Sequence, residues 1–309
     1  MIEVHDLIKT FGPLTALDRL SFSVLPGRVT GFLGPNGAGK TTTMRVILGL
    51  DDPTSGSALV AGRRYRDIVW PLHEVGSLLD ANAAHPGRSA EDHLLSLALS
   101  NGIGRRRVRS MLELTGLAPV AAKRLRTFSL GMKQRLGIAA ALLGDPPVLV
   151  FDEPVNGLDP EGVLWIRELF KALAAEGRTV FVSSHLMSEM ALTADHLVII
   201  GRGRLLVDMT TDSFVSTNAR TDVLVRSPRA GELAELLTAR GAGVRAEAAD
   251  ALGVTGLSAA EIGELAAGRG IALHELVNRR ASLEQAYLDI TGTTVEYRSG
   301  LPAQGEGQQ

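Results

Sequence analysis

The spacing of hydrophobic residues divides the first part of the chain into strand-like and helix-like stretches. Apolar and polar residues alternate within residues 1–32, which predicts two short strands, and a more apolar strand is expected at residues 29–33. From residue 40 the spacing of apolar residues becomes that of a helix, which Pro53 and Gly56 are expected to end. Residues 57–61 return to the pattern of a strand. The amino-terminal quarter is therefore expected to combine strands with one helix.

The middle of the chain is mostly helical in pattern, and the part after it alternates between strands and helices. Residues 85–143 carry apolar stripes at helical spacing, punctuated by glycine and proline. From residue 148, apolar strands alternate with helices as far as the strand at residues 196–200. Such alternation predicts right-handed crossovers and a mainly parallel sheet.

The amino-acid composition changes at about residue 215, after which Ala, Gly and Arg dominate. Four short strand-like segments alternate there with Ala/Leu-rich helices over residues 230–240 and 258–267. The order β-α-β-β-α-β is that of a small ferredoxin-like unit. We therefore expect a first domain over residues 1–212 and a second over 213–297. Residues 298–309 are polar and Gly-rich, which predicts a flexible tail.

Composition and charge exclude several classes of protein. The 309 residues are the length of about two domains, and 21% charged and 45% hydrophobic residues are ordinary for a globular chain. The net charge of −2 gives no electrostatic support for nucleic-acid binding. The absence of cysteine excludes disulfides, thiolate zinc sites and cysteine nucleophiles. No apolar stretch has the roughly 20 residues of a membrane span, and no secretory leader is visible, so we expect a cytosolic protein.

One eight-residue segment carries the most specific chemistry. It matches the pattern G-x-x-x-x-G-K-[ST] between an apolar strand and a helical pattern, which is the context that a phosphate-binding loop requires. Glycines let backbone N–H groups face phosphate oxygens, and the positive end of the following helix adds to the attraction. With five lysines in the chain, a chance match has a probability below about 1%. The segment and the residue after it predict a nucleoside triphosphate site made by Gly34, Pro35, Asn36, Gly37, Ala38, Gly39, Lys40, Thr41 and Thr42.

Two carboxylates follow the apolar strand at residues 148–151. Asp152 is expected where this strand meets the nucleotide cleft, and it would bind Mg²⁺ together with the hydroxyl of Thr41. Glu153 would point elsewhere and is the candidate general base for the attacking water. Lys40 would reach the β and γ phosphates. Taken alone, two acids after a strand are equally consistent with the start of a helix or turn.

Three further segments complete an ordered set of motifs. Residues 128–135 head a helix before Asp152, residues 156–160 follow the carboxylates, and His185 follows the strand at 179–183. In order and spacing the chain resembles the ATP-binding subunits of ABC transporters over about residues 1–212. In the terms of that family, the segments are the Walker A loop (34–41), the Walker B strand (148–152), the catalytic glutamate (Glu153), the end of the LSGGQ signature (129–132), the D-loop (158–159) and the switch histidine (His185).

The resemblance implies a site shared between two chains. In this family two nucleotide domains sandwich ATP head to tail, so Ser129 and Gly131 of the signature would bind the nucleotide held by another chain. A second copy in a head-to-tail dimer, or a close paralogue, is therefore expected. Asp159 of the D-loop would line the same site. His185 would contact the γ-phosphate and orient the water, although a histidine at a strand end, taken alone, is more often structural.

Phe11 is the candidate for contact with the base. It lies 29 residues before Lys40, where the family places an aromatic residue that stacks on adenine. Such stacking contributes roughly 1–3 kcal/mol with little base selectivity. The alternative is a core aromatic residue on the first strand.

The chain departs from the family pattern at two places. Asp80 stands where the family has the glutamine that ligates Mg²⁺ and touches the membrane partner. A carboxylate can ligate Mg²⁺ but cannot donate an amide hydrogen bond, and the alternative is an exposed loop residue. In the signature, Leu130 replaces a glycine and Met132 replaces the glutamine. Because Ser129 and Gly131 remain, we expect ATP-dependent closure to persist.

The fold expected from all these features is an α/β P-loop NTPase. It would carry an ABC-type helical subdomain over about residues 83–143 and a small C-terminal ferredoxin-like α/β domain. We expect ATP hydrolysis with Mg²⁺ to power a separately encoded integral membrane permease, most simply an exporter of drugs, antibiotics or peptides. The chain would be cytoplasmic, held at the inner face of the membrane by the permease.

The alternative is a non-transport ABC ATPase that acts on ribosomes or DNA. No nucleic-acid partner is expected, since the arginine cluster at residues 105–109 lacks interleaved aromatic residues and is better explained as a solvated helix face.

Overall fold

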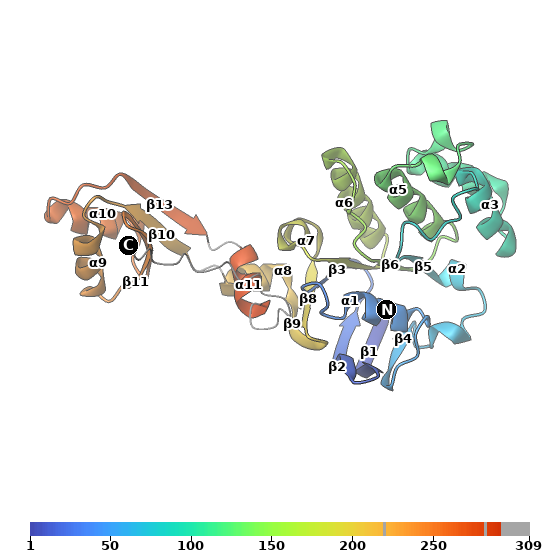
Figure 1. Ribbon diagram of the computed structural model, residues 1–309, viewed down its shortest axis with the longest axis horizontal. Helices are drawn as coiled ribbons and strands as arrows, with labels where there is room; N and C mark the ends of the chain where they lie inside the picture. The colour runs from blue at the N-terminus through green and yellow to red at the C-terminus, as the bar shows by residue number, and fades with distance from the viewer. Residues whose placement is uncertain (219–220, 281–282, 292–309) are drawn as a thin grey trace, which may run out of the picture. The chain divides into compact units, whose positions relative to one another are not determined.

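Two compact units make up the structure, a computed structural model that describes residues 1–218, 221–280 and 283–291. Of the described residues, the first unit comprises Met1–Thr211 and 289–291, and the second lies within Asp212–Leu288 (Figure 1). The tail predicted over residues 298–309 lies outside the described residues.

An antiparallel three-stranded sheet forms one layer of the first unit. Strands β1 (Ile2–Phe11) and β2 (Leu14–Val24) pair as a hairpin, and β4 (Ser55–Val60) pairs with the other edge of β1. The hairpin turns at Gly12, whose φ of 57° lies in the left-handed region that glycine tolerates. The predicted alternation is present, since most apolar side chains of the two hairpin strands are buried, namely Ile2, Val4, Leu7, Leu17, Leu20, Phe22 and Val24.

A six-stranded sheet forms the second layer and brings distant parts of the chain together. Its order is β5-β6-β7-β3-β8-β9, parallel from β5 to β8 with β9 antiparallel at the edge. Because the central strands are buried on both faces, they have the continuous apolar runs of a parallel sheet. The strands are β3 (Arg28–Leu33), β5 (Val75–Leu78), β6 (Val148–Phe151), β7 (Thr179–Ser184), β8 (His196–Gly201) and β9 (Arg204–Thr210).

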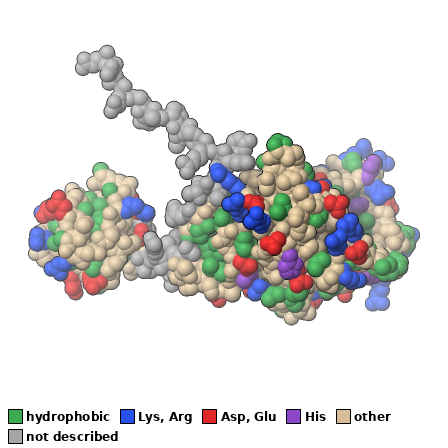
Figure 2. Space-filling model, turned by 90° about the horizontal axis from the view of Figure 1, so that it is seen from below, with side chains coloured by type: hydrophobic (Ala, Val, Ile, Leu, Met, Phe, Trp, Pro, Cys, Tyr) green, Lys and Arg blue, Asp and Glu red, His purple; other side chains and the backbone are tan. Residues whose placement is uncertain are grey.

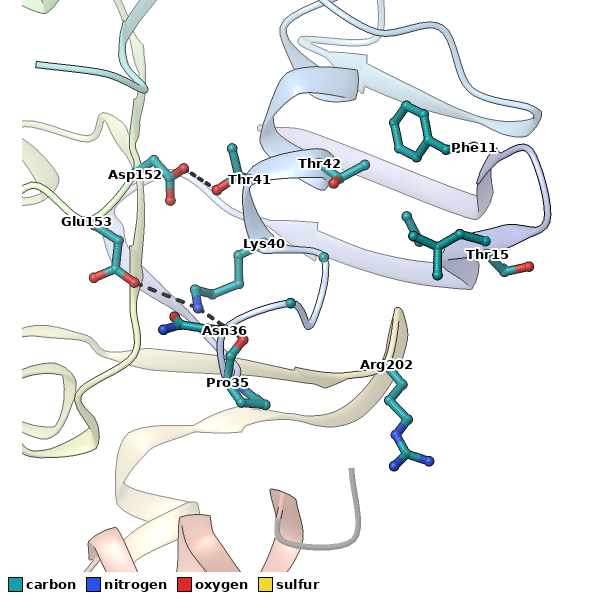
Figure 3. A pocket seen from close by; sticks show the side chains of 14 residues that line it. Phe11, Thr15, Pro35, Asn36, Lys40, Thr41, Thr42, Asp152, Glu153 and Arg202 are labelled. Atoms are coloured by element: carbon teal, nitrogen blue, oxygen red, sulfur yellow. Dashed lines mark hydrogen bonds and ion pairs between the residues drawn. The ribbon is translucent and has the colours of Figure 1, made fainter. Parts of the chain in front are cut away.

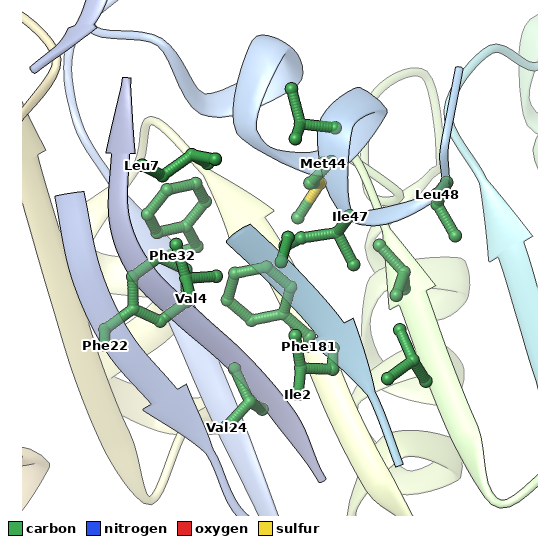
Figure 4. Packing of buried hydrophobic residues seen from close by; sticks show 14 of the residues in the cluster. Ile2, Val4, Leu7, Phe22, Val24, Phe32, Met44, Ile47, Leu48 and Phe181 are labelled. Atoms are coloured by element: carbon green, nitrogen blue, oxygen red, sulfur yellow. The ribbon is translucent and has the colours of Figure 1, made fainter. Parts of the chain in front are cut away.

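The core between these layers is built around three phenylalanine rings. The ring centroid of Phe22 lies 5.4 Å from that of Phe32, and the centroid of Phe32 lies 5.0 Å from that of Phe181. Strands from both sheets therefore meet at this cluster (Figure 4). Helix α1 (Lys40–Ile47) packs Met44 and Ile47 into the same cluster. This packing fixes the amino-terminal end of α1 relative to the strand that precedes it.

Helices dominate the middle of the chain, where the helical subdomain was predicted. The α-helices there are α3 (Ala90–Ser100), α4 (Arg105–Leu114) and α5 (Leu130–Ala141), with 3₁₀ turns at Ala118–Val120 and Leu125–Thr127. Other helical segments of the first unit are a 3₁₀ turn at Tyr65–Asp67 and the helices α2 (Pro71–Glu74), α6 (Pro160–Ala175) and α7 (Met187–Thr193). Arg105, Arg106 and Arg109 are exposed as expected, whereas Arg107 donates a hydrogen bond to the carbonyl of Leu142.

The second unit has a core of its own. Its four-stranded antiparallel sheet has the order β11-β12-β10-β13, and the element order β-α-β-β-α-β is as predicted. Acidic and basic side chains are interspersed with apolar ones on the face seen in Figure 2. The elements of this unit are β10 (Thr221–Arg226), α9 (Ala230–Thr238), β11 (Gly243–Ala248), β12 (Ala251–Thr255), α10 (Ala259–Gly268) and β13 (Glu275–Arg280). The helices α8 (Thr211–Asn218) and α11 (Leu283–Thr291) each span a boundary between the two units.

Two strands and one helix end differ from the sequence expectation. Strand β5 has only four residues, and β9 is an edge strand with a mixed exposure pattern, so neither gives a strong apolar signal. Helix α1 ends earlier than predicted because Gly49, with φ of 64°, turns the chain just after the cap at Leu48.

The close approach of α5 to β5 predicts the effect of a small substitution. A Cβ atom at Gly76 would lie 2.0 Å from the carbonyl oxygen of Ala141. We expect Gly76→Ala to lower the free energy of unfolding by about 2–3 kcal/mol, because helix and strand must move apart. Urea denaturation followed by circular dichroism measures the change.

The matched control is Gly104→Ser. Gly104 caps α4 in open space with φ of −77°, so serine should leave stability unchanged or raise it slightly. Superimposable urea denaturation curves for Gly76→Ala and the wild type would contradict the close packing of α5 on β5.

Candidate nucleotide-binding site

A cavity of about 560 Å³ opens where the two sheets and α1 meet. Its walls are formed by the end of the β1–β2 hairpin, the loop after β3, the end of β6 and the β8–β9 turn (Figure 3). Its size is in the ordinary range of small-molecule sites. The residues that line it are Phe11, Leu14, Thr15, Ala16, Pro35, Asn36, Gly37, Gly39, Lys40, Thr41, Thr42, Asp152, Glu153 and Arg202.

The loop between β3 and α1 has the geometry of a phosphate cradle. Gly37 and Gly39 have φ values of 82° and 105°, which bend the backbone in a way that side chains disfavour. A Cβ atom at Gly34 would lie 2.6 Å from the carbonyl of Ile200, so this position also requires glycine. Because α1 begins at Lys40, its free N–H groups and positive dipole end lie at the cavity. The loop therefore provides an anion site.

Lys40 lies inside this cradle and is only 7% exposed. Its ammonium donates to the carbonyl of Gly34 at 2.7 Å and lies 3.7 Å from Oε1 of Glu153. Burial lowers the pKa of Lys40, while the nearby Glu153 and Asp152 carboxylates act against that shift. A triphosphate in the cavity would supply further negative charge and favour the charged lysine.

Asp152 is held by hydroxyl groups from two other elements. Thr41 Oγ1 donates to Asp152 Oδ2 at 2.6 Å, and Ser183 Oγ donates to Oδ1. The Thr41 hydroxyl and the Asp152 carboxylate are therefore adjacent oxygen donors at the end of the cavity (Figure 3). Mg²⁺ prefers oxygen ligands of this kind, with water and phosphate oxygens completing its shell. These two residues fit the predicted metal role.

Glu153 is placed differently although it follows Asp152 directly. Its φ of 48° lies in the left-handed region, which turns its side chain away from the neighbouring carboxylate. Its N–H donates to Ser183 Oγ at 2.9 Å, and its Oε2 lies 2.9 Å from Nδ1 of His185. A carboxylate can accept a proton from water, and a histidine at this distance can fix the orientation of that carboxylate.

Ser183 contacts both acidic residues of the site but was not predicted from the sequence. It is the penultimate residue of the buried strand β7, which lies between β6 and β3 in the sheet, and its hydroxyl contacts both Asp152 and Glu153. A hydroxyl near the end of a mostly apolar strand was the available signal. Thr15 and Arg202 were also missed, because only the folding of the hairpin and the β8–β9 turn brings them to the cavity.

Phe11 is 48% exposed at the end of the hairpin and faces the cavity, which argues against the alternative of a core residue. Asp80 lies elsewhere, in a second cleft of about 470 Å³ between β5 and α5, where its Oδ1 accepts from the N–H of Asn82. Its metal role stays a prediction.

The signature and D-loop residues are not brought to the cavity of their own chain. Ser129 caps α5 by accepting from the N–H of Met132 at 3.2 Å, and Gly131 lies in the first turn of that helix. Asp159 caps α6 by accepting from the N–H of Gly162 at 2.9 Å. Their predicted contact with nucleotide requires another chain.

A strand–loop–helix anion cradle, with a carboxylate at the end of a nearby parallel strand, defines a P-loop nucleoside triphosphatase. A family profile described as "ABC transporter" matches residues 17–156. The bacitracin transport ATP-binding protein of Bacillus licheniformis is 41% identical over 71% of this chain and 73% of that protein. The chain therefore belongs to the ATP-binding proteins of ABC transporters, as the motifs predicted. It binds ATP and hydrolyses it to drive transport.

Other relatives and structures agree with this family. The lantibiotic transport ATP-binding protein of Streptococcus pyogenes is 36% identical over 69% of this chain and 92% of its own length. An uncharacterized ABC transporter ATP-binding protein of Bacillus subtilis (strain 168) is 34% identical over 96% of this chain and 97% of its own. A solved ATP-binding subunit of an ABC transporter has a TM-score of 0.64 and 28% identity, covering 70% of this chain and 92% of its own. Residues 221–284 match a domain of unknown function (DUF8746).

The two contacts of Ser183 predict a catalytic defect without loss of nucleotide. Ser183→Ala removes the partner of Asp152 Oδ1 and of the Glu153 N–H. We expect kcat for ATP hydrolysis to fall about 10- to 100-fold, with little change in ATP affinity. Steady-state phosphate release and fluorescent-nucleotide titration measure the two quantities.

Ser184→Ala is the matched control, because its buried hydroxyl accepts from the N–H of Leu186 instead. Equal activity of Ser183→Ala and Ser184→Ala would remove Ser183 from the site.

Proposed function

We propose that this chain is the ATP-binding subunit of an exporter in which two copies of it bind a separately encoded membrane permease. The relatives named for bacitracin and lantibiotic transport support a cargo of the antibiotic or peptide class. They also favour transport over the alternative of an ATPase that acts on ribosomes or DNA.

The observation that carries the proposal is the hydrogen-bonded set around Asp152 and Glu153 beside the phosphate loop. Bound between Thr41 and Asp152, Mg²⁺ would supply positive charge to the phosphates. Lys40 neutralises further phosphate charge, and Glu153 accepts a proton from the attacking water while His185 orients it. The products are ADP and phosphate, and the proton taken by Glu153 returns to solvent.

The need for a second copy follows from where the anion-binding groups lie. One set surrounds the loop before α1, and another is the amino-terminal end of α5 with Ser129 and Gly131. The second set does not line the cavity of its own chain. A head-to-tail pair of identical chains would complete both cavities, each with the α5 terminus of the other.

The permease is proposed because the chain offers a docking cleft. Among the described residues, no helix has both the length and the apolar character to cross a bilayer. The second cleft, beside Asp80, is lined by Leu50, Leu79 and His93, a mixture of apolar and polar groups suited to a protein helix. Through this contact the chain would sit at the cytoplasmic face of the membrane.

Removing the proposed base should separate binding from hydrolysis. We expect Glu153→Gln to reduce ATP hydrolysis about 100- to 10,000-fold while ATP is retained, so that an ATP-bound dimer accumulates. Size-exclusion chromatography with light scattering, with and without ATP and Mg²⁺, measures the dimer. Glu161→Gln, at an exposed position in the first turn of α6, is the control and should behave as wild type. A fully active Glu153→Gln protein would remove Glu153 from this role.

The transport role predicts a phenotype that depends on both subunits. Cells that express this chain with its permease should tolerate more of the exported compound than cells with the permease and the Glu153→Gln variant. Minimum inhibitory concentrations across a panel of peptide antibiotics measure the effect. Membrane fractionation provides the second readout, since the chain should sediment with membranes only when the permease is present. Sedimentation with membranes in its absence would contradict the proposed attachment.

A further inference from the structure

The backbone of Glu153 is held in its unusual conformation from two sides. Its N–H donates to Ser183 on β7, and its carbonyl accepts from Nε2 of Gln134 on α5 at 3.3 Å. A non-glycine residue with φ of 48° persists only where its surroundings fix it. The direction of the catalytic carboxylate therefore depends on α5 as well as on the sheet.

Gln134 has a buried amide with few other contacts. The side chain is 5% exposed, and its Oε1 has no hydrogen-bond partner among the residues that the structure describes. A buried amide with one unpaired oxygen adds little to folding stability. Its contact with the Glu153 carbonyl is thus the interaction that explains an amide at this position.

Two more contacts attach the start of α5 to the segment that follows Glu153. Leu130 packs on Gly157, where a Cβ atom would lie 2.5 Å from Leu130 Cδ2, and a Cβ at Gly131 would lie 2.8 Å from the Gly157 carbonyl. The Arg135 guanidinium lies 4.6 Å from the ring centroid of Trp165 on α6. The first turns of α5 and this segment must therefore move together.

We propose that α5 is a relay between the two ATP sites of the dimer, with Gln134 and Leu130 as its positioning residues. The inference rests on the proposed dimer, in which Ser129 contacts the nucleotide of the partner. Gln134 lies five residues after Ser129, about 7.5 Å along the helix axis. Nucleotide captured at the start of α5 thus sets the position of Glu153, which faces the nucleotide of its own chain. Each site becomes active only when the other is filled.

The relay predicts a change in cooperativity rather than in stability. The wild-type chain should hydrolyse ATP with a Hill coefficient approaching 2, and Gln134→Met should lower it to about 1 with kcat reduced about tenfold. The melting temperature should stay within about 2 °C of wild type, because the lost hydrogen bond is offset by removal of the unpaired oxygen. Thr115→Val is the control, since the buried Thr115 hydroxyl donates to its own helix and should not alter the Hill coefficient.

An exchange of side-chain size between Leu130 and Gly157 tests the contact between these two residues independently. Gly157→Ala should reduce kcat, because the new methyl group collides with Leu130 and alanine disfavours the φ of 77° at this position. Adding Leu130→Gly removes the collision and should restore part of that activity, which a merely destabilising change would not. Both readouts use the full chain with its permease.

The outcomes separate this inference from the proposed function. Failure of the Glu153→Gln protein to form an ATP-dependent dimer would refute the dimer itself. If the dimer forms and hydrolyses ATP, the relay is overturned by a wild-type Hill coefficient of 1, by an unchanged coefficient in Gln134→Met, or by a double variant no more active than Gly157→Ala.

Discussion

Parallel pairing of β3, β7 and β6 is the constraint on which the site depends. Because these strands run in the same direction, their carboxyl ends meet at one edge of the sheet, where ligands bind in open α/β folds. The phosphate loop follows β3, the two carboxylates follow β6, and Ser183 lies near the end of β7. Groups separated by more than a hundred residues are thereby placed within hydrogen-bond distance, as the contact between Thr41 and Asp152 demonstrates. The phenylalanine cluster keeps this edge in register with the hairpin that carries Phe11.

Two adjacent acids acquire different tasks from their backbone conformations. Asp152 continues from the strand and accepts a hydrogen bond from the hydroxyl of Thr41, whereas the left-handed turn at Glu153 directs its side chain toward His185. The strain of that turn costs about 1–3 kcal/mol and is maintained by neighbouring elements. Division of labour between neighbouring carboxylates here comes from geometry rather than from different residue types.

Local signals in the sequence were enough for the fold class and for much of the lining of the cavity. The phosphate loop, Asp152 and Glu153 lie in short contiguous motifs, and the family follows from their order, so Lys40 and Thr41 could be placed without coordinates. Ser183 and Gln134 could not, because their hydrogen bonds to Glu153 span 30 and 19 residues and join separate elements. Strand β5 was missed for a related reason, since four residues carry too little periodicity. The packing of Leu130 on Gly157 likewise depends on tertiary contacts that no local pattern reports.

The hydrogen bond from the Lys40 ammonium to the Gly34 carbonyl has a consequence for nucleotide binding. The ammonium is held by the loop that it serves, so this contact helps to fix the shape of the cradle. An incoming nucleotide exchanges one set of polar partners for another and does not have to organise a flexible loop. The ordering entropy that a mobile loop would lose at each turnover is thereby avoided. Rapid repeated loading is the kinetic property that such a preformed cradle favours.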